Sequence, residues 1–248
     1  MRAGGADRRV AARRTAFDTV ARVNFEIPAS TQQFLDELDA FIESTIAPMQ
    51  AKDDNDRFFD HRREDSRTDW DRGGLPNAEW EALLGEMRRA ADEAGFYRHQ
   101  LPERFGGKGG SNLEMAIVRE HLARKGLGLH NDLQNESSIV GNLVTVLMME
   151  KYGSPEQQEE WIPKMLAGEA RIGFGLTEPL HGCDATWMET TAVRDGDEWV
   201  INGEKYWNTG LHHATHDYIF ARTSGEPGDG RGITCFKIGR ASCRERVS

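Results

Sequence analysis

The segment from Phe174 to Asp184 carries residue types suited to ligand binding, in the order Phe-Gly-Leu-Thr-Glu-Pro-Leu-His-Gly-Cys-Asp. Its first residues predict a strand that delivers the Thr177 hydroxyl to a Glu-Pro turn. Gly182 then permits a ligand to approach the backbone closely. This arrangement suits a flat polar ligand that carries a phosphate. The alternative is an ordinary strand-to-loop turn that is capped by Asp184.

A second segment of this kind runs from Tyr206 to Gly210. An aromatic ring at Trp207 is followed two residues later by the hydroxyl of Thr209, at the expected end of a strand. An aromatic face can stack on a flat ligand while the hydroxyl bonds to the ligand's edge. A hairpin aromatic followed by a turn would explain the same residues.

Two further motifs give weaker indications. The glycine-rich stretch 101–110 lacks a preceding strand and a Gly-Lys-Ser/Thr element, which argues against a phosphate-binding P-loop. His212, His216 and Asp217 have a spacing that zinc would accept on a helix, but they lie between strand signals. We therefore expect a polar loop there and predict no metal site.

Composition excludes several classes of function. Lys plus Arg number 31 against 41 Asp plus Glu, a net charge of −10, which argues against a nucleic-acid partner. Mean hydropathy is −0.64, and no apolar run is long enough for a membrane span. Cys183, Cys235 and Cys243 form no disulfide framework, which indicates a reducing compartment such as the cytoplasm.

The first two thirds of the chain show helical spacing of apolar residues. We predict helices that begin after the capping residues Ser30, Asn77, Ser111 and Ser154, with a further buried helix from Ser138 to Met149. Pro48 is expected to end the first helix and Gly95 the second. The charge-dense stretch 52–74 is expected to be a loop or an insertion.

After Gly168 the apolar period changes from 3.6 to 2 residues. Short strands are predicted over 171–177, 189–194, 199–201, 205–207, 217–223 and 232–236. Asp195-Gly196 predicts a turn, and Asn202-Gly203 predicts a hairpin between its flanking strands. The fold class is therefore α+β, with an all-helical domain at 23–168 followed by an antiparallel β domain at 169–237.

Both ends of the chain differ from the body. Residues 1–22 hold six arginines and two aspartates, and predict a disordered extension. An Arg-rich transit peptide, which would direct the chain to the mitochondrial matrix, is the alternative. Residues 238–247 match the in-frame translation of a widely used sequencing adapter. We therefore expect 238–248 to be a non-native tail that takes no part in the fold.

Taken together, the two ligand-binding segments resemble the flavin-binding signatures of the acyl-CoA dehydrogenases. That family has an aromatic-x-x-Thr-Glu-Pro-x-x-Gly-Ser-Asp motif, and a Trp-x-Thr motif after a Gly-Glu-Lys hairpin. Here Gly-Glu-Lys at 203–205 stands directly before Tyr206. The Leu-Pro-Glu loop at 101–103, with Gly106-Gly107, and the stretch 152–169 resemble other parts of the family. The resemblance covers residues 23–237.

The resemblance implies an FAD enzyme of fatty acid metabolism that forms a trans double bond between Cα and Cβ of an acyl-CoA. Electrons would leave to an electron-transfer flavoprotein, and the full enzyme would be a homo-oligomer. The family's catalytic glutamate and its C-terminal helical bundle lie beyond this chain. We therefore name no catalytic residue, and expect a truncated fragment that is inactive by itself.

The resemblance also implies which residues contact the flavin: Phe174, Leu176, Thr177, Gly182, Cys183, Trp207, Asn208 and Thr209. Trp207 would lie beside the isoalloxazine, Thr209 near its N5, and Cys183 between the flavin and the substrate thioester. The sequence departs from the family at Cys183, where serine is usual, and a thiol is the weaker hydrogen-bonding group. Leu180-His181 also replaces a pair of small residues.

Two other functions fit the same sequence. The chain could retain the helical and β modules for binding or assembly without catalysis. It could also belong to a flavin-dependent acyl-CoA oxidase or a nitroalkane-oxidising relative, which oxygen reactivity would distinguish.

Overall fold

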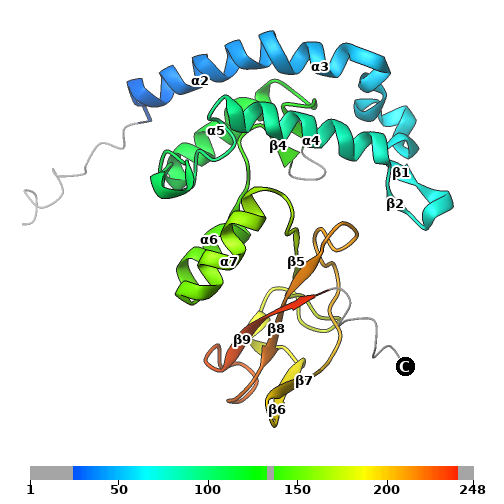
Figure 1. The fold of residues 1–248 in the computed structure, drawn as a ribbon, viewed down its shortest axis with the longest axis vertical. Helices are drawn as coiled ribbons and strands as arrows, with labels where there is room; N and C mark the ends of the chain where they lie inside the picture. The colour runs from blue at the N-terminus through cyan, green and yellow to red at the C-terminus, as the bar shows by residue number, and fades with distance from the viewer. Residues whose placement is uncertain (1–24, 133–136, 240–248) are drawn as a thin grey trace, which may run out of the picture. The chain divides into compact units, whose positions relative to one another are not determined.

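The computed structural model describes residues 25–132 and 137–239 (Figure 1). The expected extension at 1–22 and the expected tail from residue 240 onward lie outside the described residues. The expectation that 238–248 take no part in the fold is wrong for Ile238 and Gly239, which pair with β8 (His216–Arg222) at the end of the last strand. The chain divides into two compact units, residues 1–40 and 41–248.

The first unit contributes helix α2 (Ala29–Phe41), on which Phe34, Leu35 and Leu38 recur at helical spacing and are buried. The capping box predicted at Ser30 is wrong. The Gln32 N–H donates to the Pro28 carbonyl at 2.9 Å, so the helical pattern has started before Ser30 is reached.

The second unit opens with a π-helical turn (Ile42–Ile46) and helix α3 (Ala47–Ala51). The prediction that Pro48 ends the helix is wrong, because Pro48 occupies the first turn of α3. Ile46 and Ala47 keep right-handed helical φ and ψ values where the π-helical turn ends, so the helical path continues past the proline.

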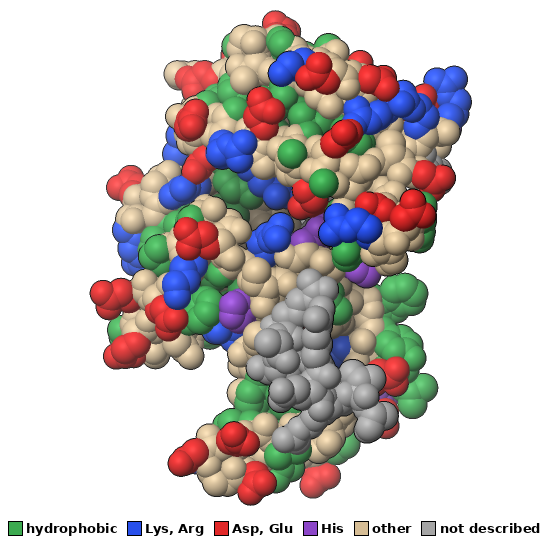
Figure 2. All heavy atoms as spheres, turned by 45° about the vertical axis from the view of Figure 1, so that its right-hand side comes forward, with side chains coloured by type: hydrophobic (Ala, Val, Ile, Leu, Met, Phe, Trp, Pro, Cys, Tyr) green, Lys and Arg blue, Asp and Glu red, His purple; other side chains and the backbone are tan. Residues whose placement is uncertain are grey.

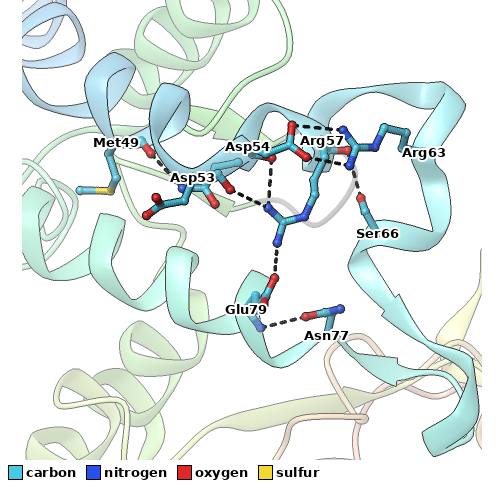
Figure 3. A network of polar contacts seen from close by, with 9 residues as sticks. Met49, Asp53, Asp54, Arg57, Arg63, Ser66, Asn77 and Glu79 are labelled. Atoms are coloured by element: carbon cyan, nitrogen blue, oxygen red, sulfur yellow. Dashed lines mark hydrogen bonds and ion pairs between the residues drawn. The ribbon is translucent and has the colours of Figure 1, made fainter.

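The charge-dense stretch expected to be a loop is ordered by short elements. It contains 3₁₀ turns and a two-stranded sheet of β1 and β2: Lys52–Phe59, His61–Arg67, Thr68–Asp69 (β1), Trp70–Arg72 and Leu75–Pro76 (β2). Figure 3 shows Arg57 at the centre of this segment. Its Nη1 donates to the carbonyls of Asp53 and Asp54 at 3.1 and 3.0 Å, and its Nη2 pairs with Glu79. Arg57 thus supports two aspartates with left-handed φ values of 52° and 59°.

Four longer helices follow: α4 (Ala78–Glu93), α5 (Asn112–Arg124), α6 (Val144–Tyr152) and α7 (Pro155–Leu166). The predicted caps are confirmed, because Asn77 accepts from the Glu79 N–H at 2.8 Å and Ser111 and Ser154 form capping boxes. The helix predicted from Ser138 is wrong at its start. There β4 (Ser137–Ser138) pairs with β3 (Asn131–Asp132) before α6 begins.

The β domain is one five-stranded sheet of β5 (Ile172–Gly175), β6 (Thr191–Asp195), β7 (Glu198–Asn202), β8 (His216–Arg222) and β9 (Ile233–Gly239). β6–β7 and β8–β9 are antiparallel, as expected for this domain. β5 and β6 run parallel to β8, so the sheet as a whole is mixed. In Figure 1, β8 lies at the centre with β9 beside it.

Only one of the two predicted turns closes a hairpin. Asp195-Gly196 joins β6 to β7, with Asp195 opposite Glu198. The hairpin predicted at Asn202-Gly203 is wrong, and residues 205–207 form no strand. A Cβ at Gly203 would lie 2.3 Å from Thr190 Oγ1, so the glycine there serves close packing.

One core cluster joins the sheet to the helices. Tyr218 of β8 is buried with Val146 and Met149 of α6 and with Ile162 and Met165 of α7. Phe174 and Phe220 pack against this cluster, their ring centroids 5.2 Å apart. The predicted order, a helical region followed by a β domain, is confirmed.

The surface carries both signs of charge. On the face drawn in Figure 2, acidic side chains lie among basic ones. Within the described ranges, no helix combines the length and the apolar character that crossing a membrane requires.

Candidate functional site

The two segments predicted to bind a ligand lie side by side at the end of β5. The Phe174 N–H donates to the Thr209 carbonyl at 3.2 Å, and the Tyr206 N–H donates to the Thr177 carbonyl at 2.9 Å. The two segments are separated by some thirty residues in the sequence, and together they form one edge of the structure at the end of β5. Local spacing predicted each segment, and the structure shows that they meet.

Trp207 stands out on this edge. Its side chain is 85% exposed, and its φ is 58°, in the left-handed region that non-glycine residues rarely adopt. Such backbone strain costs roughly 1–2 kcal/mol and tends to persist where function requires it. The result is a large aromatic face open to a flat ligand.

The hydroxyls of Thr177 and Thr209 flank this aromatic face along the chain. Thr209 is exposed and Thr177 is half-buried. In the described part of the chain, neither hydroxyl forms a side-chain hydrogen bond, so both remain available to a ligand. Thr209 and Gly210 also line a hollow of about 1200 Å³, and residues of α4 line the same hollow.

The loop after Thr177 leaves its backbone open. A Cβ at Gly182 would meet no atom within 4 Å, and Cys183 is exposed. Asp184 accepts from the Thr186 N–H at 3.0 Å, which confirms that it caps this turn. A capped turn and a ligand loop are compatible here, because the cap holds the loop and leaves Gly182 and Cys183 uncovered.

The remaining sequence-predicted residues have structural contacts. The Phe174 side chain packs against the core cluster, so its backbone is the part that lies on the edge. The Leu176 carbonyl accepts from Lys205 Nζ at 3.0 Å. Asn208 Nδ2 donates to Asp217 Oδ2 at 3.0 Å.

Glu178 and Lys205 hold the edge together. Lys205 Nζ lies 2.7 Å from Glu178 Oε1, and the side chains are 6% and 2% exposed. Glu178 also accepts from the backbone N–H groups of Glu189 and Thr190, at 2.5 and 2.9 Å. Burial acts to raise the pKa of Glu178, but the hydrogen bonds from Lys205, Thr190 and Glu189 outweigh it and lower the pKa to about 2. Glu178 is thus an anchored carboxylate of the turn.

Lys205 and Asp217 are the residues that the sequence did not reveal as parts of this site. Asp217 is a buried residue of β8, where it is followed by the apolar residues Tyr218 and Ile219, and a buried carboxyl group there requires a hydrogen-bond partner. The sequence predicted a polar loop without a metal site at 212–217, whereas His216 and Asp217 lie in β8. Of the three residues with the spacing considered for zinc, Asp217 accepts a hydrogen bond from Asn208, and the His216 ring lies edge-on to Trp161 with the ring centroids 4.7 Å apart. In the described residues, no group of three or more metal-ligating side chains gathers.

Comparison with known proteins identifies the family of this chain. Residues 56–169 match the family model "Acyl-CoA dehydrogenase, N-terminal domain". Residues 173–242 match "Acyl-CoA dehydrogenase, middle domain", and this match includes both ligand-binding segments. The chain belongs to the acyl-CoA dehydrogenase family.

Curated relatives within the family extend well beyond this chain. (2S)-methylsuccinyl-CoA dehydrogenase of Cereibacter sphaeroides is 36% identical over 63% of this chain and 27% of its own length. Glutaryl-CoA dehydrogenase of Desulfococcus multivorans is 29% identical over 87% of this chain and 49% of its own length. The chain thus spans half or less of the length of these acyl-CoA dehydrogenases.

Solved structures share the fold. A glutaryl-CoA dehydrogenase from Mycobacterium smegmatis, in complex with FADH2, superposes with a TM-score of 0.57 at 24% identity. The match covers 86% of this chain and 46% of that one. The helical region and the mixed sheet are therefore the acyl-CoA dehydrogenase fold.

Proposed function

We propose that this chain forms the helical region and the flavin-binding edge of an FAD-dependent acyl-CoA dehydrogenase. The observation that carries this proposal is the pairing of the two motif segments, which leaves Trp207 and the hydroxyls of Thr177 and Thr209 along one edge. The substrate would be an acyl-CoA thioester, dehydrogenated between Cα and Cβ. An electron-transfer flavoprotein and further copies of the enzyme would be its partners.

The residues of the edge fit a flat cofactor that carries phosphates. Trp207 offers an exposed aromatic face, and Thr177 and Thr209 offer hydroxyl donors. Gly182 and Cys183 offer an uncovered backbone to which a phosphate could bind. When bound, FAD supplies the acceptor for the hydride that leaves Cβ.

The protein's own contribution is to fix this edge. The Glu178–Lys205 pair ties the loop after β5 to the segment that carries Trp207, so the donors stand in place before a ligand arrives. A preorganised edge avoids the free-energy cost of ordering its side chains on binding. We assign no described residue to removal of the α proton. Glu178 is the carboxylate that directly follows Thr177 in the sequence, and it is held by Lys205.

Titration of the purified chain with FAD tests the proposal. Saturable quenching of flavin fluorescence is expected, and W207A should weaken the affinity by about tenfold, since stacking on an aromatic side chain contributes about 1–3 kcal/mol. W70A is the matched control, because Trp70 is also exposed (68%) but lies in the 52–74 segment. The absence of saturable binding would contradict the proposal, as would equal affinities of W207A and the unsubstituted chain. Such results would favour a non-catalytic binding or assembly role.

Oxygen reactivity of the flavin-loaded protein would then separate a dehydrogenase from an oxidase. Slow reoxidation in air, together with rapid reoxidation by an electron-transfer flavoprotein, is the outcome expected for a dehydrogenase. Rapid reoxidation by oxygen would identify the oxidase relative instead.

A further inference from the structure

Two glycines of β5 make room for a buried polar pair. Asp217 of β8 is 4% exposed and lies opposite Gly173 in register. A Cβ at Gly173 would stand 3.0 Å from Asp217 Oδ1, and one at Gly175 would stand 2.8 Å from Asn208 Nδ2. The space that both glycines leave free is thus filled by the side chains of Asp217 and Asn208.

The hydrogen bonds of this pair are incomplete if Asp217 is ionised. Asn208 Nδ2 donates to Asp217 Oδ2 at 3.0 Å. The other two oxygens, Asp217 Oδ1 and Asn208 Oδ1, are buried and have no hydrogen-bond partner in the described part of the chain. A carboxylate here would be a buried charge with one side-chain donor and no cation beside it, which is costly.

A single proton would remove this cost. On Asp217 it eliminates the buried charge and creates an O–H donor. Asn208 Oδ1 is an unpartnered acceptor on the same residue that Asp217 already contacts. An acid and an amide would then each donate and accept one hydrogen bond.

The surroundings favour the neutral form. Burial raises the pKa of Asp217, and the lowering by Asn208 and by the Tyr218 backbone is smaller. The facing residues of β5 and β9 in register are Gly173 and Ile238, which carry no charge. On β9, partial desolvation of the Cys235 thiol, together with the negative charge that Asp217 would carry if ionised, raises the pKa of this thiol to about 11, so it is neutral near pH 7. Within the described ranges, no Lys, Arg or His forms an ion pair with Asp217.

We propose that Asp217 is held as a neutral carboxylic acid in a two-way hydrogen-bonded pair with Asn208, and that this pair positions the Trp207–Thr209 segment for the cofactor. Asn208 stands between the exposed aromatic ring and the Thr209 hydroxyl, so fixing its side chain fixes both neighbours. The Phe174 N–H holds the same segment through the Thr209 carbonyl at 3.2 Å. The first half of this inference is independent of the ligand, whereas the second half rests on the proposed function.

Three variants separate a neutral pair from ordinary packing. D217N keeps one donor and one acceptor opposite Asn208, and so preserves the pair without a titratable group. D217L keeps the bulk but leaves the Asn208 amide without a partner. D195N is the control, because Asp195 belongs to the same sheet and is exposed.

The first experiment uses the chain without ligand. Infrared spectra at neutral pH should show the C=O band of a protonated carboxyl in the unsubstituted chain and in D195N, and should lose it in D217N. The second readout is the unfolding equilibrium constant of the unsubstituted chain divided by that of D217N. This ratio should rise by up to about tenfold per pH unit above the usual aspartate pKa, because only the unfolded chain then releases the proton of Asp217, and it should level off once Asp217 ionises in the folded chain. If the band is missing and the ratio of the two unfolding equilibrium constants does not change with pH, the proposal that Asp217 is neutral is wrong.

The second experiment measures FAD affinity. D217N and D195N should stay within about twofold of the unsubstituted chain, while D217L should bind at least about tenfold more weakly. If D217L does not fold, the dependence of FAD affinity on pH decides. The affinity of the unsubstituted chain should fall as Asp217 ionises, whereas that of D217N should not change with pH. The positioning role is wrong if D217L binds FAD as tightly as the unsubstituted chain, or if the pH dependence of FAD affinity is the same in the unsubstituted chain and in D217N. Failure of the unsubstituted chain to bind FAD would count against the proposed function, while the infrared band would still decide the state of Asp217.

Discussion

Lys205 Nζ joins two segments by donating to Glu178 Oε1 at 2.7 Å and to the Leu176 carbonyl at 3.0 Å. Its side chain is 6% exposed and that of Glu178 is 2% exposed, so the pair is removed from solvent. A buried pair of this kind depends on both partners, because either charge alone would remain without compensation.

K205M should therefore lower the free energy of unfolding by about 3–5 kcal/mol, because it leaves the Glu178 carboxylate buried and unpaired. The double variant K205M/E178Q should recover most of this loss. R124A is the control, since its i,i+4 pair with Glu120 is exposed and contributes about 0.5 kcal/mol or less. Urea unfolding of the four proteins provides the measurement. A loss in K205M no larger than in R124A would contradict the role given to the pair.

The same carboxylate makes stability depend on pH. The folded pKa of Glu178 is lowered from 4.5 to about 2, so the unfolded chain binds the proton more readily. The stabilisation is present above the unfolded pKa, and it is lost as the pH falls from about 4.5 towards about 2. It amounts to on the order of 3 kcal/mol. Unfolding free energies measured from neutral to acid pH should fall less steeply for K205M/E178Q, and parallel curves would exclude this contribution.

Arg57 supports the two left-handed aspartates of the 52–74 segment (Figure 3). R57A should lower the free energy of unfolding by about 1.5–3 kcal/mol, because three hydrogen bonds from a charged donor are lost. R57K should lose part of this, since an ammonium group cannot fork between the carbonyls and Glu79. Arg62 is the comparison, because its pair with Asp60 is exposed and R62A should cost little. Thermal unfolding gives the measurement. Equal losses of stability in R57A and R62A would show that Arg57 does not support the two aspartates.

Local chemistry explains the elements that were predictable from sequence. The caps at Asn77, Ser111 and Ser154 satisfy helix N–H groups within three residues, so their effect can be read from short windows. The strands around Phe174 and Tyr218 were placed to within two residues at each end, although only β5 alternates in burial along its length. The two candidate segments, 174–184 and 206–210, could be singled out because their residue types are clustered, and their ligand-binding role stays a prediction.

Non-local packing explains what was missed. Asn202-Gly203 has the composition of a hairpin turn, but Gly203 is required by its close approach to Thr190, and Asp195-Gly196 closes the hairpin. The parallel pairing of β5 with β8 joins residues more than forty positions apart. No local pattern shows such pairings. For the same reason, Lys205 could not be matched with Glu178 from the sequence.

Two glycines of the candidate site should respond differently to substitution. G175A places a Cβ 2.6 Å from Ile219 Cδ1 and 2.8 Å from Asn208 Nδ2, which should cost about 1–3 kcal/mol of stability. G182A meets no atom within 4 Å, so its stability should change by about 0.5 kcal/mol or less. If a phosphate approaches the Gly182 backbone, G182A should still weaken FAD binding. Thermal unfolding and FAD titration of both variants provide the test, and a strongly destabilised G182A would show that the loop is packed.

Trp207 should show opposite effects on stability and on binding. Its φ of 58° is strained for tryptophan and unstrained for glycine. W207G should therefore raise the free energy of unfolding by about 0.5–1 kcal/mol, after the greater entropy of glycine in the unfolded chain is subtracted from the relieved strain. The same change removes the aromatic face, so FAD affinity should fall by about tenfold, as in W207A. W207F keeps both the strain and an aromatic ring, and should resemble the unsubstituted chain in both measurements. A W207G protein that is less stable and binds FAD as tightly as the unsubstituted chain would show that the strained tryptophan serves packing, and that the edge is not the flavin site.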